Sequence, residues 1–112
     1  MLTILSILPL SSSDISSPVR NLRSGEMSPN TLELIWDDPI LREGNVDHYV
    51  ITVQDSVTPA LLNTTLFISG TQNQVVVTNL LTCTSYDFTV TPVTKFEGTK
   101  ALISLYVPAE RK

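Results

Sequence analysis

The sequence predicts an all-β protein, a sandwich of about seven short strands. Apolar and polar residues alternate with a period of two in several short runs, which is the pattern of half-buried strands. Thr and Val are frequent in these runs, and both favour strands over helices. No stretch of the 112 residues combines an apolar stripe at helical spacing with a matching helix cap. Short strands without helical partners favour a sandwich, and a closed β-barrel is the alternative architecture.

Six runs carry the strand pattern, and the clearest of them ends at Trp36 and Asp37. The runs are 31–37, 49–53, 66–68, 74–78, 86–91 and 101–107. Residues typical of turns and loops separate the runs, because Gly, Pro and Asn interrupt regular strands. These predicted loops contain Gly25 with Pro29, residues 39–44, Pro59 with Asn63, Gly70 and Gly98.

Length and charge limit what the chain can do. A chain of 112 residues, 42% of them hydrophobic, is long enough for one domain with a single core. Its formal net charge is −4 and its isoelectric point is near 4.7. An acidic chain without a basic run gives no electrostatic reason to bind nucleic acid or an anionic membrane. We expect neither as a partner.

The chain is poor in residues that carry chemistry. Cys83 and His48 are its single cysteine and its single histidine, so a Cys/His zinc site cannot be assembled. The four glycines form no phosphate-binding loop. Asp37 and Asp38 are consecutive on a predicted strand end, where neighbouring side chains point to opposite faces. We therefore expect no enzyme, no catalytic residues, no metal site and no cofactor.

The two ends of the chain differ from the middle. Residues 1–10 are apolar, but the run is far shorter than the roughly 20 residues that span a bilayer. Its length and the following serines fit a signal peptide, although no Lys or Arg precedes it. A disordered or wrongly assigned leader is the alternative. We expect a leader over 1–16, one domain over 17–108, and a linker or tail over 109–112.

The segment from Leu80 to Tyr86 is predicted to be a corner between two strands. A buried tyrosine needs a partner for its hydroxyl, and the turn just upstream offers backbone groups within reach. Burial of large rings such as Trp36 and Tyr86 contributes much of the apolar area of a small sandwich core. We therefore expect Trp36, Tyr49, Leu80 and Tyr86 to be core residues.

On these landmarks, the chain resembles a fibronectin type III domain from Ser17 to Pro108. Segments similar to the family's first strand, its tryptophan strand, the entry to its third strand and its tyrosine corner follow one another in the family's order. They are residues 18–22, 34–39, 44–49 and 79–86. The resemblance implies a seven-stranded Greek-key β-sandwich of the fibronectin type III type, used as a binding or spacer module.

One residue of the corner departs from the family pattern. The family commonly has Pro-Gly where this chain has Thr82 and Cys83, so the turn lacks the residue best suited to positive φ. Cys83 has no partner in the chain. Three states remain open for it: a free thiol, a disulfide to a neighbouring domain, or a disulfide between chains.

Two further features concern location and binding. Asn63, Thr64 and Thr65 form an N-glycosylation sequon in a predicted loop or short edge strand. Together with the apolar leader and the odd cysteine, it favours an extracellular or cell-surface protein. In the predicted loop 94–100, Lys95, Phe96 and Glu97 combine a ring with charges, as contact patches do. The alternative is that Phe96 folds back over the core.

The leading functional hypothesis is a non-catalytic extracellular module for adhesion or receptor recognition, one unit of a longer protein. Its protein partner would bind through the loops or through neighbouring domains, and the domain itself would not insert into a membrane. A purely structural spacer is the alternative. A third possibility is that a peptide or a second copy joins an open edge strand.

Overall fold

The structure is a computed structural model, and it describes residues 16–28, 30–40, 45–58 and 63–108. Residues 1–15 of the expected leader and the expected tail, 109–112, lie outside the described residues. Ser16, the last residue of the expected leader, is buried, and its carbonyl accepts a hydrogen bond of 3.0 Å from the Thr99 N–H. Ser16 therefore packs with the folded domain.

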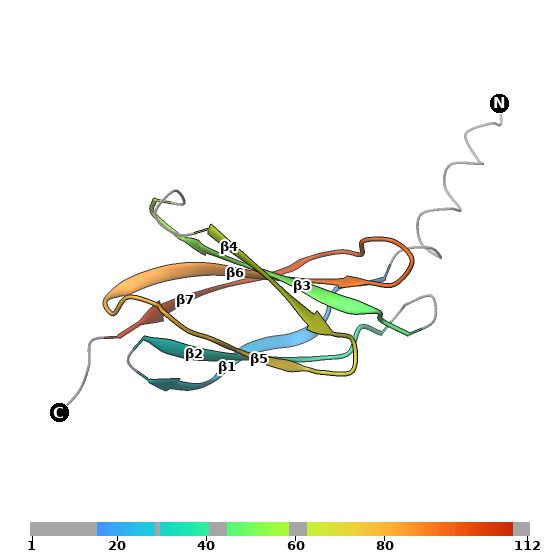
Figure 1. The fold of residues 1–112 in the computed structure, drawn as a ribbon, viewed down its shortest axis with the longest axis horizontal. Coiled ribbons are helices and arrows are strands. Elements are labelled where there is room, and N and C mark those ends of the chain that lie inside the picture. Colours follow the sequence, from blue (N-terminus) through green and yellow to red (C-terminus); the bar gives the residue numbers. More distant parts are fainter. Residues whose placement is uncertain (1–15, 29, 41–44, 59–62, 109–112) are drawn as a thin grey trace.

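Seven strands form two antiparallel sheets that face each other, so the predicted all-β sandwich is confirmed (Figure 1). The barrel alternative is wrong, because the strands are divided between two separate sheets. The strands are β1 (Arg20–Ser28), β2 (Thr31–Asp37), β3 (His48–Asp55), β4 (Asn63–Ser69), β5 (Gln74–Val77), β6 (Thr84–Val93) and β7 (Ala101–Val107).

The strand order is β1-β2-β5 in one sheet and β4-β3-β6-β7 in the other. The chain therefore crosses between the sheets after β2, after β4 and after β5, which gives the Greek-key connection. Strand β3 is central, and its Ile51 lies between Leu66 of β4 and Val90 of β6. The edges of the sheets are β1, β5, β4 and β7.

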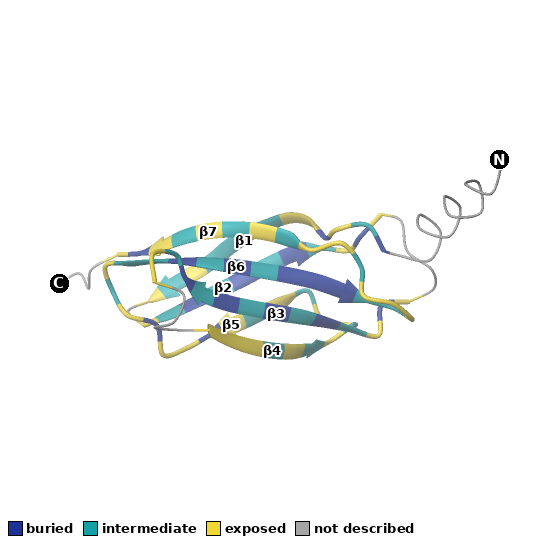
Figure 2. Ribbon diagram, turned by 90° about the horizontal axis from the view of Figure 1, so that it is seen from above, coloured by how far each residue is buried: buried dark blue, intermediate teal, exposed yellow. Residues whose placement is uncertain are grey.

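The core lies between the sheets, where alternate residues of β2, β3 and β6 point inward (Figure 2). Trp36 from one sheet meets Tyr49 from the other edge-to-face, with ring centroids 5.2 Å apart. Each fully buried large apolar side chain stabilises the fold by roughly 1.5–3 kcal/mol relative to exposure. The four expected core residues, Trp36, Tyr49, Leu80 and Tyr86, are all at most 1% exposed.

The prediction of a loop at Gly25 is wrong, because Gly25 lies inside β1. The pairing of β1 with β2 shifts register between Arg20 and Arg23 and again between Ser24 and Met27. A β carbon on Gly25 would lie 2.4 Å from Glu33 Oε1 of the neighbouring strand. Glycine thus permits close packing within an irregular strand here. Composition alone does not distinguish a glycine in such a strand from a glycine in a turn.

Strand β4 is longer than the apolar run 66–68 and begins at Asn63. The polar residues Asn63, Thr64 and Thr65 pair with Gln54, Val53 and Thr52 of β3. All three are exposed, because β4 is an edge strand. The sequon therefore lies on an edge strand and not in a loop, one of the two placements that its sequence left open.

Candidate interaction surface

The corner before β6 is held by its tyrosine. The Leu81 N–H donates a hydrogen bond of 2.8 Å to the hydroxyl oxygen of Tyr86. The Leu80 side chain is buried, and its N–H donates to the carbonyl of Asn30 at 3.0 Å. The Asn30 side-chain amide in turn donates to the Leu80 carbonyl. These contacts tie the turn between β1 and β2 to the corner, although the two segments lie far apart in sequence.

Cys83 occupies a left-handed backbone conformation, with φ of 59°. This conformation is unfavourable for residues other than glycine. The Cys83 N–H donates to the Val107 carbonyl at 2.6 Å, so the residue lies beside the end of β7. The Cys83 thiol is exposed and is not part of a disulfide. Its hydrogen bond with the Tyr106 hydroxyl raises the pKa of that phenol.

The described residues of three loops lie at the end of the sandwich opposite Cys83: 38–40 and 45–47 between β2 and β3, 70–73 between β4 and β5, and 94–100 between β6 and β7 (Figure 1). We call this end the loop pole. Backbone hydrogen bonds connect its loops: the Asp47 N–H donates to the Val93 carbonyl at 2.7 Å, and the Gly70 N–H donates to the Asp47 carbonyl at 3.1 Å. The pole is therefore a connected surface.

In the loop between β6 and β7, residues 94–97 turn back toward β6, with the side chains of 95–97 exposed. Val93 and Glu97 form an isolated antiparallel bridge, and the Thr94 N–H donates to the Phe96 carbonyl at 3.1 Å. Phe96 is 52% exposed, and Lys95 and Glu97 beside it are exposed too. The exposed ring argues against the alternative that Phe96 covers the core. Ile40, in the loop after β2, is a second exposed apolar residue at this pole, with 68% of its surface accessible.

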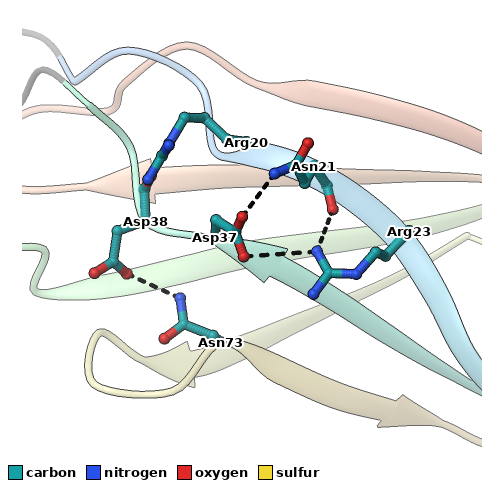
Figure 3. Close-up of polar contacts among 6 residues, drawn as sticks. All are labelled: Arg20, Asn21, Arg23, Asp37, Asp38 and Asn73. Carbon is teal, nitrogen blue, oxygen red and sulfur yellow. Dashed lines mark hydrogen bonds and ion pairs between the residues drawn. The ribbon is translucent and has the colours of Figure 1, made fainter.

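A polar cluster links β1 to the end of β2 (Figure 3). The Asn21 amide donates to Asp37 Oδ2 at 2.7 Å, and the Arg23 guanidinium lies 3.6 Å from Asp37 Oδ1. The Asn21 hydrogen bond, helped by the charges of Arg23 and Arg20, holds the pKa of Asp37 below its ordinary value. Asp37 is thus a partnered strand-end carboxylate.

Asp38 faces a different set of partners from its neighbour Asp37 (Figure 3). Its Oδ1 accepts hydrogen bonds from the Asn73 amide at 2.9 Å and from the Tyr49 hydroxyl at 3.5 Å. Its carbonyl accepts from Arg20 Nε at 2.8 Å. The two carboxylates are therefore used separately to join β1, β2 and the turn before β5.

Across the described ranges, no group of three or more His, Cys, Asp or Glu side chains lies close enough to hold a metal ion. Within the same residues, no helix is long and apolar enough to cross a membrane. Cys83 and His48 lie at opposite ends of the sandwich, since Cys83 contacts the end of β7 and His48 pairs with Val93 beside the loop pole. The only thiol and the only imidazole are therefore not brought together.

Three predicted features thus lie at separate places. Lys95, Phe96 and Glu97 are at the loop pole, Cys83 is at the other end, and Asn63 is at the start of the edge strand β4. Ile40, at the start of the predicted loop 39–44, is a further exposed apolar residue at the loop pole.

Comparison with solved structures shows the same fold in other proteins. The fn3 domain of the human collagen alpha-1(XX) chain superposes with a TM-score of 0.77 at 20% identity, covering 91% of this chain and 94% of that one. A two-domain fibronectin type III segment of chicken tenascin gives a TM-score of 0.73 at 13% identity, covering 82% and 50%. The FN1 to FN3 segment of chicken CNTN1 gives 0.71 at 14% identity, covering 84% and 33%. This chain thus spans half of the tenascin segment and a third of the CNTN1 segment.

A search of curated protein sequences found no match to the chain. The family model for the fibronectin type III domain matches residues 17–103, which include all of β1 to β6 and the start of β7. The strand order, the buried Trp36 and the Tyr86 corner agree with that match. The chain belongs to the fibronectin type III domain family.

Proposed function

We propose that this chain is a non-catalytic extracellular module that recognises a protein partner through its loop pole, as one unit of a longer protein. The observation that carries the proposal is the exposure of Phe96 and Ile40 at that pole, beside the charges of Lys95 and Glu97. Aromatic anchors surrounded by polar groups are the composition of protein–protein contact sites. The connected loops hold this surface in place before a partner binds.

The positions of the first and last described segments favour a unit within a longer chain. Ser16 contacts Thr99 at the loop pole, whereas Val107 contacts Cys83 at the opposite end. Preceding and following domains would therefore attach at opposite ends, which suits a linear array. The tenascin segment that shares the fold contains two such domains, and the CNTN1 segment runs from FN1 to FN3.

An extracellular location is supported by the sequon and by the cysteine. Asn63 is exposed at the start of an edge strand, and N-linked glycans occupy such surface positions. The Cys83 thiol is exposed next to the end of β7, close to where a following domain would begin. We propose that Asn63 carries a glycan and that Cys83 forms a disulfide with a neighbouring domain or a second chain.

Intact mass tests these two modifications. The chain is expressed in a secretory host, and its mass is measured before and after enzymatic deglycosylation and reduction. The proposal expects a glycan mass that disappears in Asn63→Gln, and a Cys83 adduct or disulfide that disappears on reduction. A secreted protein with the unmodified mass and a stable free thiol would contradict both.

Binding through the loop pole is tested on a panel of immobilised extracellular proteins probed with the 112-residue chain. For each protein that binds, affinity is compared for the wild type, Phe96→Ala and Val57→Ala. Val57 is the matched control, because it is 85% exposed and lies in the loop after β3, away from the loop pole. We expect at least a tenfold weaker Kd for Phe96→Ala alone. If the wild type, Phe96→Ala and Val57→Ala bind a panel protein with equal affinity, recognition through this pole would be contradicted.

A spacer without its own ligand is the second candidate, and the opposite placement of the two ends also favours it. In a spacer, the distance between the flanking domains is what matters, and the loop side chains are free to vary. Combined alanine substitution of Ile40, Lys95 and Phe96 separates the two candidates. If no panel protein binds the wild-type chain more tightly than the triple variant, the spacer is favoured.

A further inference from the structure

Strand β7 is an edge strand that carries no charged residue. Its seven residues, Ala-Leu-Ile-Ser-Leu-Tyr-Val, alternate in exposure, and Leu102 and Tyr106 on the outer face are 65% and 54% exposed. It pairs with β6 along its length and is the last strand of its sheet. An exposed, apolar edge strand of this length is a template for pairing with another strand.

The other three edges are less suited to such pairing. Strand β1 contains Arg20, Arg23 and Glu26 and two register shifts, and β5 is only four residues long. Strand β4 begins with the polar sequence Asn-Thr-Thr. Charges, irregular pairing and shortness are the devices by which proteins protect their sheet edges. Among the described edge strands, β4 and β7 carry no charge and pair regularly over seven residues, and β7 is the more apolar of the two, with an apolar or aromatic residue at every position but Ser104.

The sequence of β7 is nearly symmetric about Ser104. If two antiparallel copies pair with Ser104 opposite Ser104, then Leu102 lies opposite Tyr106 on the outer face. On the inner face Ile103 lies opposite Leu105, and Ala101 lies opposite Val107. Every pair then matches apolar with apolar, or serine with serine. Directly opposed aromatic and aliphatic side chains stabilise a sheet by roughly 0.2–1 kcal/mol a pair.

From this register we propose that β7 is a homophilic interface, at which a second copy of the chain adds its own β7 antiparallel about a two-fold axis through Ser104. The two four-stranded sheets then form one continuous sheet, with Leu102 and Tyr106 of each copy in contact with Tyr106 and Leu102 of the other. The interface is isologous, as in most homodimers, because the same strand serves both copies.

The charges near this interface permit the pairing. The nearest carboxylate on the outer face is Asp87 of β6, which accepts a hydrogen bond from Ser104. In the paired sheet the two Asp87 residues are separated by three strand spacings, roughly 14 Å. This distance exceeds the Debye length of about 8 Å at physiological ionic strength, so their repulsion is largely screened.

Association is tested by sedimentation velocity over a concentration series, under reducing conditions so that Cys83 disulfides do not contribute. The wild-type chain is expected to show a concentration-dependent dimer, which Leu102→Asp weakens at least tenfold. Phe67→Asp is the matched control, because Phe67 is 69% exposed on β4 at the other edge of the same sheet and the substitution changes the net charge equally. A monomer at every concentration, or loss of the dimer in Phe67→Asp alone, would overturn the proposal.

The register is tested by cross-linking. In a Cys83→Ser background, Ser104→Cys places two thiols directly opposite each other, within the separation that a disulfide spans. Leu102→Cys is the control, because the two residues 102 would be four positions apart along the strands, about 13 Å. Oxidation is expected to give a covalent dimer with Ser104→Cys and far less with Leu102→Cys. Equal cross-linking of both variants would overturn the proposed register, and circular dichroism of the variants shows whether they remain folded.

Discussion

The backbone N–H of Leu81 donates a 2.8 Å hydrogen bond to the hydroxyl of Tyr86, five residues later in the chain. The Tyr86 ring is buried in the core and packs near Phe88, with ring centroids 6.2 Å apart. One side chain thus fills the core and fixes the turn that precedes β6. The corner positions Cys83 as well, because the thiol lies between Leu81 and Tyr86 in sequence.

Tyr86→Phe removes the hydroxyl and leaves the Leu81 N–H without this partner. We expect the free energy of unfolding to fall by about 1 kcal/mol, the usual cost of an unpaired hydrogen-bonding group. Urea denaturation measures the change. Tyr106→Phe is the control, because Tyr106 is 54% exposed and the same loss of a hydroxyl costs little there. No shift in the Tyr86→Phe midpoint would show that the hydroxyl does not stabilise the corner.

Substitution of Cys83 tests the strain at its φ of 59°. Glycine adopts this conformation freely, but it also makes the unfolded chain more flexible, so the two effects partly cancel. We expect Cys83→Gly to raise the free energy of unfolding by up to about 1 kcal/mol, and the β-branched Cys83→Val to lower it by a similar amount. Denaturation under reducing conditions ranks the variants by their free energy of unfolding. Cys83→Ala separates the effect of losing the thiol from the effect of relieving the strain. Equal stability of the Gly and Val variants would contradict the strain.

Gly70 is expected to be intolerant of a side chain. A β carbon there would lie 1.9 Å from the Val46 carbonyl oxygen, a backbone atom that cannot rotate away. We expect Gly70→Ala to destabilise the fold by roughly 1–3 kcal/mol, the range for overpacking. Gly25→Ala is the comparison, since its clash is with the flexible ends of Glu33 and Ile35, so a smaller cost is expected there. Thermal melts of both variants show which substitution destabilises the fold more. A larger loss of stability in Gly25→Ala than in Gly70→Ala would contradict this account.

Much of the fold could be predicted because its signals are local. Alternation around Trp36, Tyr49 and Tyr86 marks β2, β3 and β6, and the spacing from Leu80 to Tyr86 marks the corner. Each of these depends on residues close together in sequence. The two-residue period then divides each strand between a core face and an outer face.

The features that could not be predicted depend on pairing between distant segments. Whether Gly25 forms a turn or lies in a strand depends on its contact with Glu33 in β2. The hydrogen bond from the Asp47 N–H to the Val93 carbonyl depends on the pairing of β3 with β6. The partners of Asp37 depend on the irregular register of β1, which brings Asn21 and Arg23 to the same carboxylate. Composition and periodicity contain no information on such register shifts.

Asp37 is expected to make stability depend on pH. Its pKa in the folded chain lies below the ordinary value of 3.8, chiefly because the Asn21 amide donates a hydrogen bond to the carboxylate. A lowered folded-state pKa means that the ionised carboxylate stabilises the fold at pH values above the unfolded-state pKa. That contribution is lost as the pH falls through the folded-state pKa.

Asn21→Gly tests this dependence cleanly, because Asn21 has φ of 50° and glycine retains that backbone conformation while the amide is removed. We expect the pKa of Asp37, followed by NMR of its carboxyl carbon, to rise toward 3.8 in the variant. The variant should also lose less stability than the wild type between neutral pH and pH values below the folded-state pKa. Arg23→Gln is the comparison: the charge of Arg23 and its own hydrogen bond each lower the pKa of Asp37 less than the Asn21 hydrogen bond does, and we expect a smaller rise. A larger rise in Arg23→Gln than in Asn21→Gly would show that charge, not the hydrogen bond, controls this carboxylate.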